Sequence, residues 1–114
     1  MVLGETDKTF TQMRRGTLPS CVLALLCEGD LYSFEITKIL SEIEGLATSE
    51  GTIYPLLNRL SSENLVNSYW QESPDGPPRR YYRITKEGLA VLENFTNQWK
   101  VFTESVNSLL KDLP

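Results

Sequence analysis

Residues 49–88 read SEGTIYPLLNRLSSENLVNSYWQESPDGPPRRYYRITKEG. In order, this stretch predicts an amphipathic helix, a strand, a Gly/Pro-rich tip followed by paired arginines, a second strand and the start of another helix. That order is typical of a winged helix-turn-helix, a fold that is mainly α with a small β-hairpin. Such a unit places one helix face and one basic loop on the same side, where they can contact a DNA groove and its flanking phosphates.

The first helix of this stretch has one apolar stripe and one polar side. The stripe has the i, i+3, i+4, i+7 spacing of a helix face that packs on a core, and it consists of Ile53, Leu56, Leu57 and Leu60. The opposite side carries Gly51, Thr52, Tyr54, Pro55, Asn58, Arg59 and Ser62. A merely solvated side would usually hold more Lys and Glu. We therefore expect this side to read the major groove of DNA, through Thr52, Tyr54, Asn58 and Arg59.

The start of this helix is ambiguous in the sequence. Ser49 is a good N-cap, but Pro55 would then lie too deep in the helix to belong to its first turn. We therefore expect the regular helix to begin near Thr52 or to bend at Pro55. In either case Thr52 and Tyr54 lie near the positive end of the helix dipole, where phosphate is favoured.

Two more helices are predicted upstream. Gly45 occupies the position just past a helix end that glycine often takes, and residues 45–48 form the turn of the motif. Leu18–Cys27 is the most apolar run and predicts a buried first helix, in which Pro19 is tolerated only near the start. The helix before the turn has an apolar stripe of its own, made of Ile36, Ile39, Leu40 and Ile43.

A β-hairpin is predicted after the recognition helix. Leu65–Gln71 has strand composition, residues 73–78 are turn-forming throughout, and Arg79–Ile84 forms the return strand. Pro77 and Pro78 cannot donate ladder hydrogen bonds. We therefore expect the strands to pair only below these prolines and the tip to stand free.

The return strand is rich in arginine, which marks it as the wing. Alternation along the strand sends Tyr82 inward and leaves Arg79 and Arg83 on the other face. We expect Arg79 and Arg80 to grip the DNA backbone or the minor groove, with Arg83 as a further DNA contact.

The last predicted helix carries an unbroken heptad seam. Its apolar residues recur at alternating intervals of 3 and 4 residues, and they are Leu92, Phe95, Trp99, Phe102, Val106, Leu109 and Leu113. The upstream helices already supply a core, so this narrow seam needs another surface to cover it. We expect a second copy of the chain to do so. The alternative is that the helix folds back on its own domain.

Several of these motifs resemble the PadR family of bacterial transcriptional regulators. The resemblance extends from about Arg14 to Leu110 and implies a dimeric winged-helix repressor. It further implies that the C-terminal helix makes the dimer contact and that a small molecule or stress often triggers the response. The motifs are Phe34-Glu35-Ile36, Gly51-Thr52-Ile53-Tyr54-Pro55-Leu56-Leu57, and Gly76 through Arg80 followed by Tyr81-Tyr82-Arg83-Ile84-Thr85 with Glu87-Gly88.

The expected organisation has three parts. Residues 1–13 are an N-terminal extension, residues 14–87 the winged helix-turn-helix domain, and residues 88–114 the C-terminal dimerisation helix. Two features depart from the family's pattern. Ser33 stands where a glycine is usual before the aromatic residue, and the extension before Met13 is longer than in many members.

Trp99 lies on the seam with an aromatic residue one turn to either side. Together Phe95, Trp99 and Phe102 predict a flat aromatic slot between two subunits, a candidate pocket for a small aromatic effector. Some PadR-like regulators that sense aromatic drugs resemble this chain in having a tryptophan at the corresponding point. The alternative is that these residues form only dimer core, and the two interpretations are compatible.

The charge distribution restricts the partners. The net charge is -4, and the basic and acidic counts are 4 and 7 in residues 1–48, 5 and 5 in residues 49–88, and 2 and 3 in residues 89–114. The DNA-facing stretch is therefore neutral within an acidic chain, so we expect few phosphate contacts and a larger share for specific contacts. Acidic balance also argues against RNA or an anionic membrane as a partner.

Catalysis and metal binding find no support in the sequence. The chain has no histidine, the commonest general base and metal ligand near neutral pH, and no cofactor motif. Cys21 and Cys27 are about 9 Å apart along a helix, so they cannot pair, and we interpret them as buried apolar filler rather than a zinc or redox site.

The chain is expected to act in the cytoplasm. Arg14 and Arg15 precede an apolar run as in an export leader, but Pro19 interrupts the run and no cleavage pattern follows. The function that fits is a sequence-specific repressor of transcription, dimeric on an inverted-repeat operator and released by a small molecule or stress. The alternative is a winged-helix module that docks another protein without reading DNA.

Overall fold

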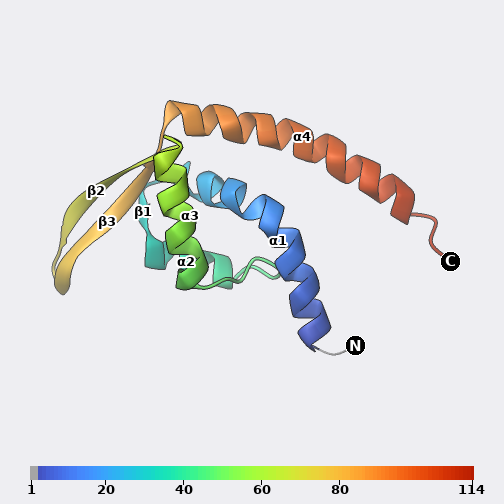
Figure 1. The fold of residues 1–114 in the computed structure, drawn as a ribbon, viewed down its shortest axis with the longest axis horizontal. Coiled ribbons are helices and arrows are strands. Elements are labelled where there is room, and N and C mark those ends of the chain that lie inside the picture. The colour runs from blue at the N-terminus through green and yellow to red at the C-terminus, as the bar shows by residue number, and fades with distance from the viewer. Residues whose placement is uncertain (1–2) are drawn as a thin grey trace.

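The computed structural model describes residues 3–114, with the side chains of residues 8–114 (Figure 1). The predicted class, mainly α with a small β-structure, is confirmed. The helices are α1 (Leu3–Leu26), α2 (Ser33–Ser41), α3 (Glu50–Ser62) and α4 (Lys86–Leu110). The strands are β1 (Leu31–Tyr32), β2 (Val66–Ser73) and β3 (Gly76–Ile84).

One apolar core joins the first three helices to the base of the sheet. The stripe of α3 is buried as expected, whereas in α2 only Ile36 and Leu40 of the predicted stripe are buried and Ile39 is exposed. Burial of these side chains supplies the main driving force for folding. The core consists of Leu18, Val22, Leu23, Leu26, Ile36, Leu40, Ile53, Leu56, Leu57, Leu60, Val66 and Tyr82.

The sheet has three antiparallel strands in the order β1-β3-β2. Leu31 pairs with Tyr82, and Tyr32 pairs with Tyr81. The sequence predicts only the hairpin of β2 and β3, because a two-residue strand is too short to show alternation. This extra strand covers one edge of β3 near its base and fixes the hairpin to the helical part of the molecule.

The hairpin is paired as far as its tip, contrary to the expectation of a free tip. Ser73 pairs with Gly76, and an irregularity of register lies between Gln71 and Ser73. Because Gln71 pairs with Arg79, the single residue Glu72 faces both prolines of β3. This bulge accommodates two residues that cannot donate hydrogen bonds, and the ladder continues on either side of them.

The first helix is much longer than the predicted Leu18–Cys27. It begins at Leu3, so Pro19 lies deep inside it rather than near its start. A proline here removes the hydrogen bond to the carbonyl of Arg15, and such a site kinks a helix. Figure 1 shows that α1 does change direction along its length. The predicted boundary between residues 13 and 14 falls within this helix, and residues 1–2 of the predicted extension lie outside the described residues.

The ends of α2 and α3 also differ from the expectations. Helix α2 ends at Ser41, so Ile43 and Gly45 lie beyond it, and Ile43 is exposed. Gly45 serves the turn instead, with a positive φ of 86° that favours glycine. Helix α3 begins at Glu50 with Ser49 as N-cap, earlier than the predicted Thr52, and keeps a proline in its interior.

Helix α4 extends away from the rest of the molecule (Figure 1), which measures 57 × 35 × 21 Å. Near its start, Leu92 packs against the core. Further along, the seam is open: the exposed fraction is 43% for Trp99, 61% for Phe102 and 81% for Leu109. Among the described residues, no helix has the length and apolar character needed to cross a membrane.

Candidate nucleic-acid interface

The outward face of α3 is available for contacts. Thr52, Tyr54, Asn58 and Arg59 are all exposed, while the opposite stripe of the helix is buried. The predicted phase of this helix is therefore confirmed. That these four residues contact DNA remains a prediction.

The exposed residues of α3 fall into three sectors of its circumference. At 100° per residue, Asn58 lies in the middle of the exposed face, and Thr52 and Arg59 lie together on one flank. Both of these flanking residues border a cavity shared with α1. Tyr54 lies on the opposite flank of the helix.

The start of α3 is fixed to α2 through one carboxylate. Glu50 accepts hydrogen bonds from the hydroxyl of Thr37 at 2.6 Å and from the hydroxyl of Ser33 at 3.2 Å. The serine at position 33 therefore has a definite partner on α3. These bonds hold the N-terminal turn of the recognition helix at a set position against α2.

The paired arginines of the wing point to opposite faces of the hairpin, as strand alternation requires. Arg80 donates from Nε to the hydroxyl of Ser68 at 3.0 Å, and its guanidinium lies 5.5 Å from the ring centre of Tyr82. Arg79 lies on the other face, 4.8 Å from the ring centre of Tyr32. The aromatic rings hold both side chains against the sheet by cation–π contact.

Arg83 differs from the other two because it is bound within the chain. Its Nη2 and Nε donate to Oδ2 of Asp30 at 2.9 and 3.1 Å, and the hydroxyl of Tyr69 donates to the same oxygen at 2.6 Å. The Tyr69 hydrogen bond first, and the Arg83 guanidinium second, hold the pKa of Asp30 below its ordinary value. The charge of Arg83 is therefore already compensated.

Sequence reasoning did not single out Asp30. Asp30 and Arg83 are 53 residues apart, and only the pairing of β1 with β3 brings them together. No local pattern signals such a contact. Sequence reasoning also missed Arg14 and Arg15 as functional candidates, because it weighed them only as a leader.

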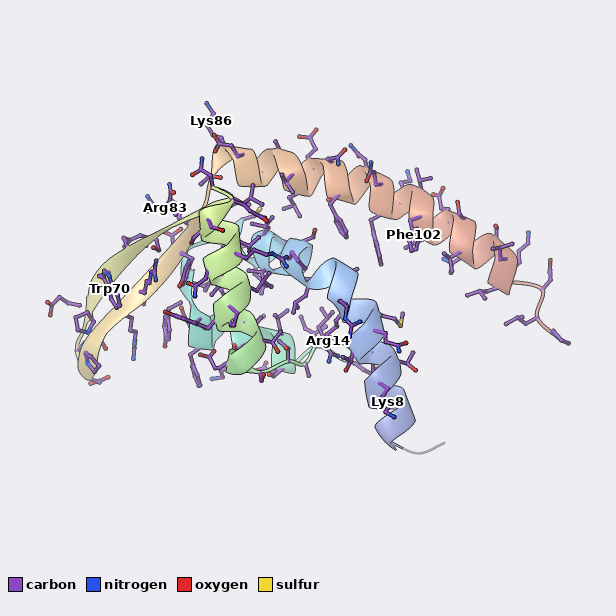
Figure 2. The ribbon with its side chains drawn as sticks, viewed as in Figure 1. Lys8, Arg14, Trp70, Arg83, Lys86 and Phe102 are labelled. Atoms are coloured by element: carbon purple, nitrogen blue, oxygen red, sulfur yellow. The ribbon has the colours of Figure 1, made fainter. Side chains whose placement is uncertain are left out.

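The three predicted pocket residues lie together on α4. The ring centres of Phe95 and Trp99 are 5.7 Å apart, and those of Trp99 and Phe102 are 6.3 Å apart, both pairs stacked. Figure 2 shows Phe102 on the side of α4 that faces α1. The aromatic residues are thus assembled within one chain.

Two cavities flank these rings in the space between α1 and α4. They have volumes of about 530 and 390 Å³, and both are lined by Phe95, Trp99 and, from α1, Met13 and Thr17. Sequence reasoning placed the pocket between two subunits and drew its lining from α4 alone. The contribution of α1 was missed because its helix was expected to begin only at residue 18.

The cysteines and the carboxylates of the described residues form no metal site. Cys21 is half-buried, which raises its pKa, whereas Cys27 is exposed beyond the end of α1, so the expectation of buried filler was wrong for Cys27. Within the described part of the chain, no group of three or more Cys, Asp or Glu side chains could hold a metal ion.

Comparison with known proteins agrees with this architecture. Residues 22–94 match the model of the transcriptional regulator PadR-like family. The chain is 33% identical over 81 residues to the transcriptional regulator Rv3488 of Mycobacterium tuberculosis, which covers 71% of this chain and 74% of that protein.

Two crystal structures are similar over nearly the whole fold. A PadR family transcriptional regulator from Eggerthella lenta superposes with a TM-score of 0.84 at 36% identity, covering 96% of each chain. A PadR-like transcriptional regulator from Bacillus cereus superposes with a TM-score of 0.80 at 37% identity, covering 90% of this chain and 99% of the other.

Proposed function

The chain belongs to the PadR-like family of transcriptional regulators, and from this we propose that it is a homodimeric repressor that binds an inverted-repeat operator and is released by a small aromatic molecule. Members of the family are regulators that bind DNA and are not enzymes. The observation that carries the proposal is the exposed polar face of α3 beside an arginine-bearing wing. A regulator of this kind acts on the chromosome, so we place it in the cytoplasm.

The proposed DNA contacts are of two kinds, contacts to base edges and contacts to phosphates. Asn58, in the middle of the exposed face, and Tyr54 on its flank would contact base edges in the major groove. Arg80, on the sheet face that packs on the core, and Arg79 on the other face would bind phosphates. We assign a smaller contribution to Arg83, since Asp30 already compensates its charge. Thr52 and Arg59 complete the set on the α1 flank.

The DNA-binding proposal is tested by fluorescence anisotropy with duplex DNA from the region upstream of the protein's own gene. Asn58→Ala or Tyr54→Ala should weaken binding to the operator by about 1–3 kcal/mol and leave binding to random DNA nearly unchanged. Arg79→Ala with Arg80→Ala should weaken binding to both and reduce the log-log salt slope by about one unit per lost phosphate contact.

Lys111→Gln, at the far end of α4, is the control because it removes one positive charge away from the proposed surface. If Asn58→Ala and Tyr54→Ala had no effect on operator binding, the recognition-face assignment would be wrong. Failure of the wild-type protein to bind any DNA while it captured a partner protein would favour the docking-module alternative.

Dimer formation is proposed from the open seam of α4. Trp99, Phe102 and Leu109 are exposed in a single chain, and a two-fold axis along this seam would bury them against their own copies. Such a dimer can set two α3 helices about 34 Å apart, one turn of DNA, which requires an inverted-repeat operator.

Effector release is proposed from the stacked rings around Trp99. The two flanking cavities have the size and apolar, aromatic lining of small-molecule sites. A planar aromatic ligand would relieve repression only if it bound more tightly to a subunit arrangement that fits DNA poorly.

The effector proposal is tested by tryptophan fluorescence. Planar aromatic cations should quench the wild-type signal and should quench Trp99→Ala much less. The remaining Trp70, an exposed residue of β2, reports on quenching that is independent of the pocket. Equal quenching of both proteins would overturn the effector proposal and leave the DNA-binding proposal standing.

A further inference from the structure

A cavity of about 460 Å³ separates α1 from α3 at the edge of the recognition face. Helix α1 contributes one face of four residues with helical spacing plus Pro19, helix α3 contributes another such face, and the turn before α3 contributes Thr48. Its walls are Thr11, Arg14, Arg15, Leu18, Pro19, Thr48, Thr52, Pro55, Leu56 and Arg59.

The cavity is strongly basic in an otherwise acidic protein. The chain has six arginines and a net charge of -4, yet Arg14, Arg15 and Arg59 all line this one cavity. None of the described residues that line it is a carboxylate. Three guanidinium groups with no carboxylate among these lining residues make a site that favours an anion.

The three arginines are held in different ways. Arg14 is anchored, because its Nη1 donates to the carbonyl of Gly45 at 3.0 Å and its Nη2 donates to the hydroxyl of Thr11 at 3.2 Å. The guanidinium groups of Arg15 and Arg59 form no hydrogen bond or ion pair with any residue that the structure describes. Their donors are therefore available to a ligand.

Hydroxyl groups complete the donor set. Thr48 and Thr52 line the cavity and can donate hydrogen bonds to ligand oxygens. Arginines and hydroxyls at close quarters are the groups that recognise phosphate, since the planar guanidinium matches two phosphate oxygens at once. A carboxylate ligand would use fewer of these donors.

We propose that this cavity between α1 and α3 is a phosphate-binding site, in which Arg15 and Arg59 bind the phosphate oxygens and Arg14 provides a fixed positive charge. The phosphate has two possible sources, a DNA backbone group beside the recognition face or a free phosphorylated compound. The first source rests on the DNA-binding proposal above, and the second is independent of it.

The first experiment asks whether the free protein binds phosphate. Inorganic phosphate is titrated against the side-chain Nε–H signals of the arginines, with sodium chloride at equal ionic strength as the reference. Phosphate should shift the signals of Arg15 and Arg59 and leave that of Arg79 unmoved. Arg15→Gln should abolish the shift at Arg59, while the charge-matched Lys111→Gln should preserve it. The Arg15 side chain has no hydrogen-bond or ion-pair partner among the described residues, and Lys111 lies at the end of α4, so both variants should fold.

The second experiment identifies the source. Salt-dependent DNA binding is compared between wild type, Arg15→Gln and Lys111→Gln. If the pocket takes a backbone phosphate, Arg15→Gln lowers affinity for every DNA sequence and reduces the log-log salt slope by about one unit. Phosphate-induced shifts with an unchanged slope assign the site to a free phosphorylated compound.

The absence of both effects would overturn the proposal. A wild-type protein that bound no DNA would defeat the DNA-binding function alone, because the titration with inorganic phosphate still answers the question for the pocket.

Discussion

At the scale of single residues, Asp30 organises the base of the wing. One of its oxygens accepts hydrogen bonds from Tyr69 on β2 and from Arg83 on β3, and the residue itself immediately precedes β1. All three strands thus meet at one carboxylate. These three side chains are only partly buried. Their contribution to stability therefore depends mainly on hydrogen bonds to the ionised carboxylate, which are stronger than hydrogen bonds between neutral groups.

This carboxylate should make stability depend on pH in a definite range. The Tyr69 hydrogen bond and the Arg83 guanidinium hold the folded pKa of Asp30 below its ordinary value of 3.8. Its contribution is therefore complete above that value and is lost as the pH falls through the folded pKa. Asp30→Asn should reduce the free energy of unfolding by a constant amount near neutrality, and the difference should shrink below about pH 4.

Urea unfolding of both proteins from about pH 7 down to about pH 3 measures this difference. Parallel curves over the whole range would contradict the assignment, because they would show that Asp30 titrates alike in the folded and unfolded chains.

A second residue-scale prediction concerns two tyrosines that differ in the hydrogen bonding of their hydroxyl groups. The hydroxyl of Tyr82 is buried and has no hydrogen-bond partner among the described residues, whereas that of Tyr69 donates to Asp30. Tyr82→Phe removes an unsatisfied polar group and should keep or raise stability, while Tyr69→Phe loses the hydrogen bond to Asp30 and should lower stability. Urea midpoints give both values, and a large loss in Tyr82→Phe would show that its hydroxyl has a partner.

At the scale of elements, the junction between the sheet and α4 is closely built. Thr85 caps α4 by accepting a hydrogen bond from the amide of Gly88, and its hydroxyl donates to the carbonyl of Asn64. Gly88 is buried against the chain at Leu65, where a Cβ would overlap the Leu65 carbonyl oxygen and crowd the side chain of Ile84. The direction in which α4 leaves the domain is set here.

Gly88→Ala should therefore destabilise the protein although alanine is the better helix former. The backbone of Leu65 must move to make room, and we expect a loss of about 1–3 kcal/mol. Gly16→Ala is the matched control, because nothing lies within 4 Å of its Cβ position in α1 and helix propensity alone should raise stability by about 1 kcal/mol. Thermal and urea unfolding measure both, and equal shifts in the two variants would refute the crowding at Gly88.

The sequence predicts the elements that have long, regular patterns. The stripe of α3 and the seam of α4 are examples, because a repeated spacing fixes which face is apolar. The true start of α1 was not predicted, because a proline is unfavourable inside a helix and Pro19 was therefore placed near the helix start. In the folded protein, tertiary packing tolerates Pro19 in the helix interior. Strand β1 was not predicted because it has only two residues. The end of α2 was predicted too late because Ile43 continues the apolar spacing after the helix has ended.

The candidate site could be predicted to the same degree. The exposed face of α3 and the wing arginines follow from local sequence. What could not follow are contacts between distant segments: the pairing of Asp30 with Arg83, and the approach of α1 to both α3 and α4. These depend on the packing of whole elements, for which a single sequence holds no local signal.

At the scale of the whole molecule, the exposed seam of α4 should determine the oligomeric state. Phe102→Asp places a charge on the seam and should convert a dimer to monomers in sedimentation experiments. Val101→Asp is the matched control, because Val101 is equally exposed but lies off the seam, and it should leave the dimer intact. A monomeric wild-type protein that bound its operator tightly would contradict this prediction.

Helix α1 is the common wall of the two kinds of cavity. Arg14 lines both the basic cavity against α3 and the smaller apolar cavity against α4, so a shift of α1 changes the shape of both. Any coupling through this helix is thermodynamically reciprocal. An effector that reduces the affinity for DNA a hundredfold by moving α1 must itself be held a hundredfold less tightly by the DNA-bound protein, so an occupied operator raises the effector concentration needed to vacate it.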